Sequence, residues 1–362
     1  MADLIEYKCP SCGGKLEFNS AAQKMKCPFC LSEFDPADFQ QQDDDLEQKP
    51  AENSSDSAAE DSAESGWTQS ETEGLRVYKC QSCGGEVVGD ETMAAGKCPY
   101  CDNPVIMTGQ FSGDLKPDLV IPFKLDKEAA KKALLQHMEG KPLLPKIFKS
   151  ENHIDEIKGI YVPVWLFNAE ADAQFRYEAK KIRRWTDQQF SYTETSVFHV
   201  DRAGTISFEN VPVDGSSKMD NTLMESLEPF DCKTAVPFQT AYLSGYLADR
   251  YDADGKACQP RADERIRQST RQEFAKTVQG YDAVNTEHED IRLTEGKTQY
   301  ALYPVWLLNT SWNGNKYTFA MNGQTGKFVG DLPSDKGKAW AIFLAVTAAV
   351  TVVSYLIGMM LK

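Results

Sequence analysis

The sequence predicts an α+β protein with two small N-terminal cysteine modules, an internally duplicated α+β body and one C-terminal transmembrane helix. Three observations predict this organisation. Eight cysteines fall into two modules of identical spacing, a tryptophan-containing motif occurs twice in the middle of the chain, and the last residues are apolar and almost uncharged. A chain of 362 residues has room for two or three domains of this kind.

The two cysteine modules both read C-x2-C-x14-C-x2-C. Zn2+ binds four thiolates in a tetrahedron, and a C-x2-C turn directs two sulfur atoms at one metal ion. In each module two glycines follow the first cysteine pair, and glycine readily adopts the positive φ needed to leave such a turn. We therefore expect two zinc ribbons, in residues 1–39 and 75–106, with one structural Zn2+ in each. The predicted ligands are Cys9, Cys12, Cys27 and Cys30 in the first ribbon and Cys80, Cys83, Cys98 and Cys101 in the second.

A disulfide framework and a redox-active cysteine pair are the alternatives to zinc. Disulfides form in oxidising compartments, and redox CxxC pairs usually occur singly beside a βαβ pattern, so zinc is favoured. A four-thiolate site has no open coordination position, so these metals are expected to be structural rather than catalytic. Cys232 and Cys258 have no partner motif. Two ordinary thiols are the favoured interpretation of them, with a disulfide or a third metal site as alternatives.

Residues 40–74 separate the two modules and have the composition of a disordered linker. They contain eleven acidic residues and one lysine, with almost no large apolar side chain. Such a segment buries too little surface to fold, and its charge keeps it extended. The linker either lets the first ribbon search a wide volume for a partner or serves as a passive spacer.

The body, residues 107–333, carries an internal repeat. Residues 161–168 (YVPVWLFN) match residues 302–309 (LYPVWLLN), and a second β-rich run follows each copy, at residues 174–177 and 316–319. Upstream, residues 121–123 (IPF) resemble residues 236–238 (VPF), and a helical segment follows each. We expect two halves, residues 107–235 and 236–333, packed about a pseudo-twofold axis.

Two helices are expected in the repeat. The first begins after Asp126 as N-cap and ends at Gly140 as C-cap, and the second covers about residues 262–278. Residues 241–255 are then an insertion in the second half. Trp165 and Trp306 are expected in the core, with a ligand groove between the halves as the alternative.

Residues 339–361 form an uncharged apolar stretch of 23 residues at the C-terminal end. As a helix it would extend roughly 35 Å, enough to cross a bilayer core of about 30 Å. Its length and composition favour a membrane span over a buried core helix. Lys336 and Lys338 precede the stretch and Lys362 follows it, which favours a cytoplasmic body. With no apolar N-terminal signal region, we expect a single-pass cell-membrane protein with its N-terminal body in the cytoplasm.

The charge balance and the catalytic motifs that do not occur narrow the classes of function open to this sequence. Acidic residues outnumber Lys and Arg by 54 to 39, which gives a net charge of -15 and no overall basic footprint for nucleic acid. The first ribbon has a small local excess, from Lys8, Lys15, Lys24 and Lys26, so nucleic-acid binding through that ribbon remains the alternative. No phosphate loop, dinucleotide or hydrolase motif occurs, and residues 286–290 (TEHED) look like a solvated loop. We expect a non-enzymatic protein, and no small-molecule substrate is inferred.

Several segments together carry a resemblance: the CxxCGG and CPxC pairs, residues 159–165 (GIYVPVW), residues 244–252 (SGYLADRYD), residues 303–306 (YPVW) and the apolar end. The chain resembles the bacterial TFIIB-type zinc-ribbon membrane proteins, which are often labelled primosomal protein N' or PriA-type helicases because of the ribbon. Relatives of that kind are encoded beside phage-shock protein A and SPFH or virion-core-like proteins. The resemblance implies a membrane-stress scaffold with SPFH-like or phage-shock-like protein partners.

Overall fold

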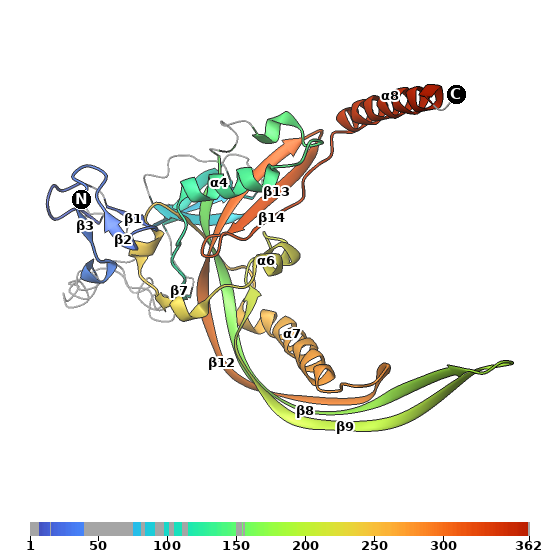
Figure 1. The fold of residues 1–362 in the computed structure, drawn as a ribbon. Helices are drawn as coiled ribbons and strands as arrows, with labels where there is room; N and C mark the ends of the chain where they lie inside the picture. The colour runs from blue at the N-terminus through green and yellow to red at the C-terminus, as the bar shows by residue number, and fades with distance from the viewer. Residues whose placement is uncertain are drawn as a thin grey trace.

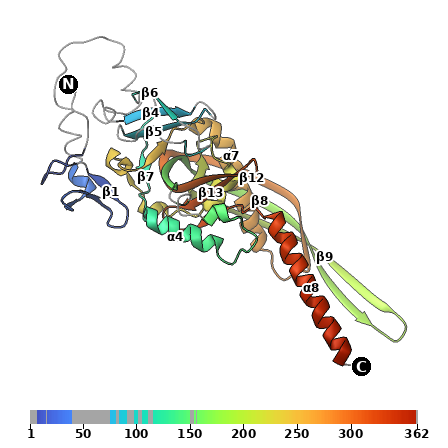
Figure 2. The ribbon, with the colours of Figure 1, turned by 90° about the horizontal axis from the view of Figure 1, so that it is seen from above.

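The computed structural model describes residues 7–14, 16–39, 75–80, 84–90, 98–100, 105–110, 115–149, 154 and 156–360. The acidic segment 40–74 and two of the predicted ligands, Cys83 and Cys101, lie outside these residues. The described chain is a mixed α and β structure with a small N-terminal sheet, a large body sheet and helices packed on it (Figure 1). The small sheet lies at one end of the molecule, and the last helix leaves the opposite end (Figure 1, Figure 2).

The first cysteine module is a three-stranded antiparallel sheet. Its strands are β1 (Glu17–Asn19), β2 (Lys24–Lys26) and β3 (Glu33–Phe34), and the 3-10 helix η1 (Pro36–Phe39) follows. Leu16, Phe18 and Met25 are buried beneath it. In so small a unit these few apolar side chains make a small core, so the cysteines are needed to hold it together.

The second cysteine module forms part of the body sheet. β4 (Leu75–Cys80) pairs with both β5 (Glu86–Asp90) and β6 (Val105–Gln110). β5 in turn pairs with β11 (Leu247–Asp249) of the body. The two modules therefore differ in setting, because one has its own sheet and the other extends the large one.

Two very long antiparallel strands run through the centre of the large sheet. They are β8 (Lys158–Thr186) and β12 (Ala283–Trp312), and both bend strongly (Figure 1). Val162 pairs with Tyr303, and these residues hold the same place in the two copies of the PVW motif. The acidic stretch 286–290, expected as a loop, instead belongs to β12. Its side chains are largely exposed and it has few apolar residues, so it lacks the alternating pattern that marks a strand.

Each long strand has a hairpin partner and a short parallel neighbour. β9 (Ser191–Asp214) pairs with β8, while β13 (Asn315–Asn322) pairs with β12 and with β14 (Phe328–Gly330). β11 runs parallel to β8, with Leu247 opposite Ile160. β7 (Leu119–Val120) runs parallel to β12, with Leu119 opposite Ala301. Ile160 and Ala301 are again equivalent positions of the two motif copies.

The expected match between residues 121–123 and 236–238 is wrong. β10 (Val236–Pro237) pairs antiparallel with β7 at its outer side. The position equivalent to β7 is held by β11, which lies in the segment expected to be an insertion. A match of three residues is too short to define a repeat, whereas backbone pairing determines which strands are equivalent.

Helices α4 (Lys127–Met138) and α7 (Gly255–Lys276) follow β7 and β11. Asp126 caps α4 by accepting from the N–H of Ala129, as the sequence predicted, and Asp254 caps α7 by accepting from Ala257. The predicted start of the second helix near residue 262 is wrong, since Pro260 lies inside α7 rather than before it. Shorter elements complete the body: α6 (Asn221–Leu227), η2 (Lys146–Lys149), η3 (Cys232–Thr234) and η4 (Thr240–Leu243).

α7 packs against the middle of the curved strands (Figure 1). Ala169, Ala171 and Ala173 are buried at alternate positions of β8, where small side chains let the helix approach the strand. Phe175 lies further along the same face and contacts Phe274 of α7, with ring centroids 4.9 Å apart. This cluster holds the curved ribbon to the helix.

Trp165 and Trp306 are both buried, as predicted, and equivalent hydrogen bonds form at and beside each of them. The N–H of Gly215 donates to Pro163 O at 2.9 Å, and the N–H of Gly323 donates to Pro304 O at 2.9 Å. The indole of Trp165 donates to Ala253 O at 2.8 Å, and that of Trp306 donates to Leu125 O at 3.1 Å. Each tryptophan therefore contacts the loop before the helix of the other half.

The last helix, α8 (Lys336–Met360), is long and apolar enough to cross a membrane. Within its span Lys336–Met359 the most apolar window of 18 residues has a mean hydropathy of 2.2, and none of that window is buried against the described chain. Its base is held to the body. The N–H of Asp335 donates to Leu143 O at 2.9 Å, and Lys338 Nζ donates to Leu144 O at 2.6 Å.

Candidate metal centre and the groups around it

Cys9, Cys12, Cys27 and Cys30 lie together, with their sulfur atoms all within 4.8 Å of one another. The closest pairs, Cys9 with Cys30 and Cys12 with Cys27, are 3.4 Å apart. A disulfide requires about 2.05 Å, so these are four separate thiols. Tetrahedral Zn2+ with Zn–S bonds of about 2.3 Å would place neighbouring sulfurs about 3.8 Å apart, which is close to this arrangement. The cluster could hold a metal ion.

Two turns of the backbone present these sulfurs. The N–H of Cys9 donates to Gly14 O at 2.7 Å, and that of Gly13 donates to Cys9 O at 2.8 Å. The second turn uses Cys27, whose carbonyl oxygen accepts from Leu31 at 2.9 Å. Gly13 has a φ of 73°, which only glycine adopts at little cost. The local sequence thus places one cysteine pair on each turn, with both pairs facing a common centre.

The electrostatics of the cluster favour a cation. Hydrogen bonds from the hydroxyl and backbone of Ser32 lower the pKa of the Cys30 thiol to about 6. A hydrogen bond from Gly14 lowers the pKa of Cys12, but contacts with Cys27 and Cys30 outweigh it and raise that pKa to about 12. Four thiolates at this spacing repel one another, so full ionisation of the cluster requires a positive charge between them.

The second cysteine module is described in part. The N–H of Cys80 donates to Gly85 O at 2.8 Å and that of Gly84 donates to Cys80 O at 2.9 Å, as in the first turn of the first module. Cys98 is buried, and its sulfur accepts from the N–H of Tyr100 at 3.4 Å. Cys83 and Cys101 lie outside the described residues, so the second metal site stays a prediction.

The first module packs directly on the body, near η4. Tyr7 hydrogen-bonds with Thr240 at 2.5 Å, and Ser244 Oγ donates to Leu16 O at 2.9 Å. Gln23 Nε2 donates to Phe123 O at 2.6 Å, beside the aromatic core. In the structure this ribbon therefore contacts the body, which was not expected of a module that searches a wide volume. The segment 40–74 lies outside the described residues.

The remaining cysteines are two separate thiols. Cys232 lies 3.2 Å from the hydroxyl of Tyr303, and burial raises its pKa. Cys258 donates to Asp214 O at 3.6 Å, and burial raises its pKa to about 11. Both are free. Because a metal ligand must be a thiolate, neither environment favours metal binding.

Two buried carboxylates, Asp214 and Asp249, were not singled out from the sequence. Burial raises the pKa of Asp214 to about 8, against the opposing hydrogen bond from Ser216 N–H. Burial also raises the pKa of Asp249 to about 7, although the Ser216 and Tyr100 side chains lower it. Asp214 Oδ2 and both carboxylate oxygens of Asp249 have no hydrogen-bond partner of normal geometry within the described chain. In the sequence, the run of acidic residues from Asp249 to Asp254 marks the region of Asp249.

The other half of the body fills the place equivalent to that of Asp214 with a neutral side chain. Asn322 holds the place of Asp214, since it pairs with Val305 as Asp214 pairs with Val164. Its amide donates to Leu227 O and Pro229 O, at 3.0 and 3.1 Å, and its oxygen accepts from Gln324 N–H at 2.9 Å. An amide therefore satisfies this position completely, whereas the carboxylate of Asp214 does not.

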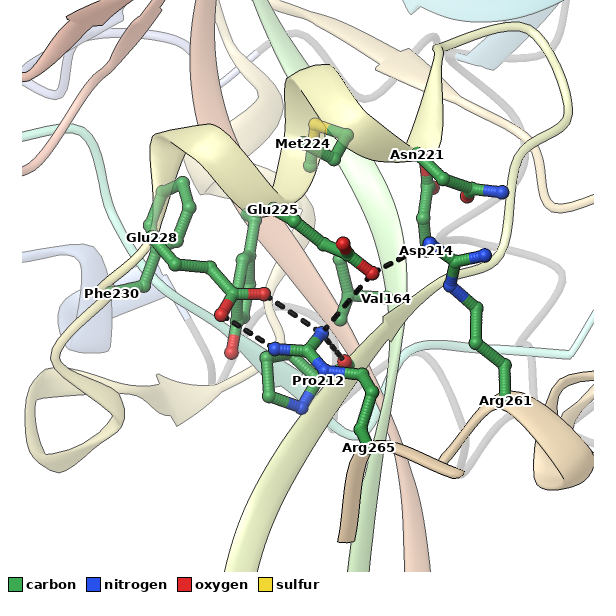
Figure 3. A pocket seen from close by; sticks show the side chains of 11 residues that line it. Val164, Pro212, Asp214, Asn221, Met224, Glu225, Glu228, Phe230, Arg261 and Arg265 are labelled. Carbon is green, nitrogen blue, oxygen red and sulfur yellow. Dashed lines mark hydrogen bonds and ion pairs between the residues drawn. The ribbon is translucent and has the colours of Figure 1, made fainter. Parts of the chain in front are cut away.

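A small pocket opens beside Asp214, between α6 and α7 (Figure 3). Arg265 of α7 crosses it and donates to both oxygens of Glu228, at 2.9 and 2.7 Å. Arg265 also donates to Pro212 O at 2.5 Å, and Arg261 pairs with Glu225 at 2.6 Å. These ion pairs occupy the pocket and join the helices. They fit a structural role better than a substrate site, because the charged groups already have partners.

The chain is 31% identical over 358 residues to the uncharacterized protein YdjG of Bacillus subtilis (strain 168), and the match covers 99% of this chain and 98% of that protein. No protein-family model matches. No solved structure matches.

Proposed function

This chain belongs to the family of Bacillus subtilis YdjG, and from that premise we propose that it is a non-enzymatic, C-terminally anchored scaffold. It recruits protein partners at the cytoplasmic face of the cell membrane. The observation that carries the proposal is α8, an exposed apolar helix long enough to cross a bilayer. A helix that is apolar all round and has no protein covering it requires an apolar environment.

The connection between α8 and the body supports anchoring rather than a loose tail. Asp335 caps the helix by accepting from the N–H groups of Gly337 and Lys338, at 2.9 and 3.2 Å. The same segment is hydrogen-bonded to Leu143 and Leu144, which follow α4. The first ribbon lies at the opposite end of the molecule (Figure 1, Figure 2). In a membrane-anchored chain this arrangement directs the ribbon away from the bilayer.

We assign Zn2+ to the four-cysteine cluster and a second Zn2+ to the ribbon of Cys80, Cys83, Cys98 and Cys101. Sulfur ligands in a closed tetrahedral set favour zinc and leave no position for a substrate. Both ions are then structural. The shared turn at Cys9 and Cys80 supports the second site.

We also infer that the body arose by duplication. The unit is a short parallel strand, a helix capped by aspartate, and a long strand with its hairpin partner. Its two helices bury matching positions: Ala130, Leu134 and Met138 in α4, and Cys258, Ala262 and Ile266 in α7, each at a constant offset of 128 residues. The reciprocal tryptophan contacts support the same inference.

The first ribbon offers an apolar spot for a partner. Phe29 and Leu31, beside the second cysteine turn, are 76% and 67% exposed. Exposed apolar residues on a small rigid module are typical of protein docking sites. By the resemblance of the chain, the partners are SPFH-like or phage-shock-like proteins.

Affinity capture from gently solubilised membranes tests the proposal. The full chain should return an SPFH-like or phage-shock-like protein, and Phe29→Asp with Leu31→Asp should lose it. Leu135→Asp, on the exposed face of α4 at 44% exposure, is the matched control and should retain the partner. Recovery of the chain without protein partners but with nucleic acid, lost on replacing Lys8 and Lys24, would instead favour the nucleic-acid alternative.

A further inference from the structure

The hairpin of β8 and β9 extends beyond the rest of the sheet. β12 covers β8 only as far as Lys180, which pairs with Ala283. Beyond that point, residues 181–186 pair with residues 191–196 alone. A two-stranded ribbon without a packed face is only marginally stable in water. This hairpin tip, residues 181–196, therefore has no third strand beside it. Only its base is held, where the N–H of Ile182 donates to Asp282 Oδ2 at 2.5 Å and Lys181 Nζ lies 5.5 Å from the centroid of the Tyr281 ring.

The tip carries exposed aromatic side chains. Trp185, Phe190 and Tyr192 are 44%, 62% and 40% exposed. Trp185 and Tyr192 are a direct cross-strand pair whose rings stack with centroids 5.4 Å apart. Phe190 lies in the turn, which is held by hydrogen bonds from Gln189 and Phe190 to Asp187. The aromatic group is thus organised although it faces solvent.

The tip is also basic, in a chain that is strongly acidic. Residues 181–196 contain three basic side chains, Lys181, Arg183 and Arg184, and two acidic ones, Asp187 and Glu194, so the tip is net positive whereas the whole chain has a net charge of -15. The guanidinium of Arg183 lies 5.4 Å from the ring centroid of Trp185. Aromatic rings mixed with Lys and Arg favour the headgroup region of a bilayer, where the rings are half buried and the cations meet anionic lipid.

The tip projects from the same side of the body as α8 in both views (Figure 1, Figure 2). We propose that the hairpin tip, residues 181–196, binds the surface of an anionic lipid bilayer as a second membrane contact beside α8. This inference rests on the proposed membrane anchor. Negative lipid matches the local positive charge, and each basic residue near such a surface strengthens binding about fivefold. Two contacts would fix the orientation of the body on the membrane.

Fluorescence of the full chain in lipid nanodiscs tests this contact. The chain has six tryptophans, so the signal of Trp185 is taken as the difference between the natural chain and Trp185→Phe. The probe is a brominated phosphatidylcholine, which quenches nearby indoles, in discs with or without phosphatidylglycerol. We expect Trp185 to be quenched in anionic discs and much less in neutral ones. Arg183→Gln with Arg184→Gln should weaken the contact on the order of 25-fold.

Lys8→Gln with Lys24→Gln, in the ribbon at the opposite end, is the matched control and should leave the quenching unchanged. If Trp185 is unquenched in anionic discs while the chain co-purifies with them, the tip stays in water or meets a protein, and the inference fails while the anchor stands. Equal quenching in both kinds of disc overturns the role of lipid charge. If the chain does not enter discs at all, both the anchor and the inference fail.

Discussion

The indole N–H of Trp165 donates to the backbone carbonyl oxygen of Ala253 over 2.8 Å. Trp306 does the same to Leu125 over 3.1 Å. Each bond joins a central strand of one half to the loop that precedes the helix of the other. The two halves are therefore coupled reciprocally, and the bonds tie both helices to the central strand pair.

Replacing either tryptophan should cost similar stability. In Trp165→Phe or Trp306→Phe a partly buried carbonyl oxygen loses its donor, which costs about 1 to 3 kcal/mol of unfolding free energy. Chemical denaturation of the purified chain measures it. Trp185→Phe, at the exposed hairpin tip, is the control and should change stability by less than about 0.5 kcal/mol. A neutral effect at one buried site alone would mean that the two contacts are not equivalent.

Two equivalent glycines should tolerate alanine differently. A Cβ at Gly323 would lie 2.6 Å from the Phe123 ring and 3.0 Å from Pro304 O. At Gly215 the nearest atom would be Trp165 Nε1, at 3.1 Å. Gly323→Ala should therefore destabilise by about 1 to 3 kcal/mol through overpacking, and Gly215→Ala by less. Thermal melts of the two variants compare them directly, and the reverse order would contradict the packing described.

Asp214→Asn should stabilise the chain at high pH. Burial raises the pKa of Asp214 to about 8, above the pKa of an aspartate in the unfolded chain. The natural chain therefore loses stability as the pH rises from the lower of these two pKa values to the higher. An amide does not titrate. The variant should gain on the order of 4 kcal/mol over the natural chain between pH 5 and pH 8. Denaturation at both pH values measures the gain. Asp172→Asn, on the exposed side of β8, should show none, and an equal gain there would refute the assignment to Asp214.

Zinc content should follow the two cysteine modules separately. Elemental analysis is expected to give two zinc ions in the natural chain, and one in either Cys9→Ser or Cys80→Ser, because each site needs its full thiolate set. Cys232→Ser, at a thiol outside the modules, should keep both ions. One ion in the natural chain would reject the second site.

The sequence predicted the parts of the fold that depend on local chemistry. The cysteine spacing predicted the cluster of Cys9, Cys12, Cys27 and Cys30, and Asp126 predicted the start of α4. The C-cap of α4 is Glu139, one residue before the predicted Gly140, which has a φ of 66°. The burial of Trp165 and Trp306 followed from the repeated motif. In each case the signal lies within a few residues of the structure that it predicts.

Contacts between distant segments could not be predicted in this way. Tyr7 meets Thr240 across 233 positions of the chain, and nothing in either local sequence indicates the other. β11 was missed because its three residues lie in a segment without a strand-like pattern. The sequence did not show that Asp214 and Asp249 are buried, because acidic residues are usually exposed and the acidic run from Asp249 to Asp254 resembles an exposed segment. Only the folded arrangement shows that Asp214 Oδ2 and both carboxylate oxygens of Asp249 have no hydrogen-bond partner within the described chain.

Recruitment to the membrane tests the central proposal most directly. Cells carrying the full chain, or a chain ending at Asp335, are fractionated, and the SPFH-like or phage-shock-like partner is quantified in the membrane fraction. We predict that the partner accompanies the membrane with the full chain and moves to the soluble fraction when α8 is removed. An unchanged distribution of the partner between the two fractions would contradict the role of this protein as an anchored scaffold.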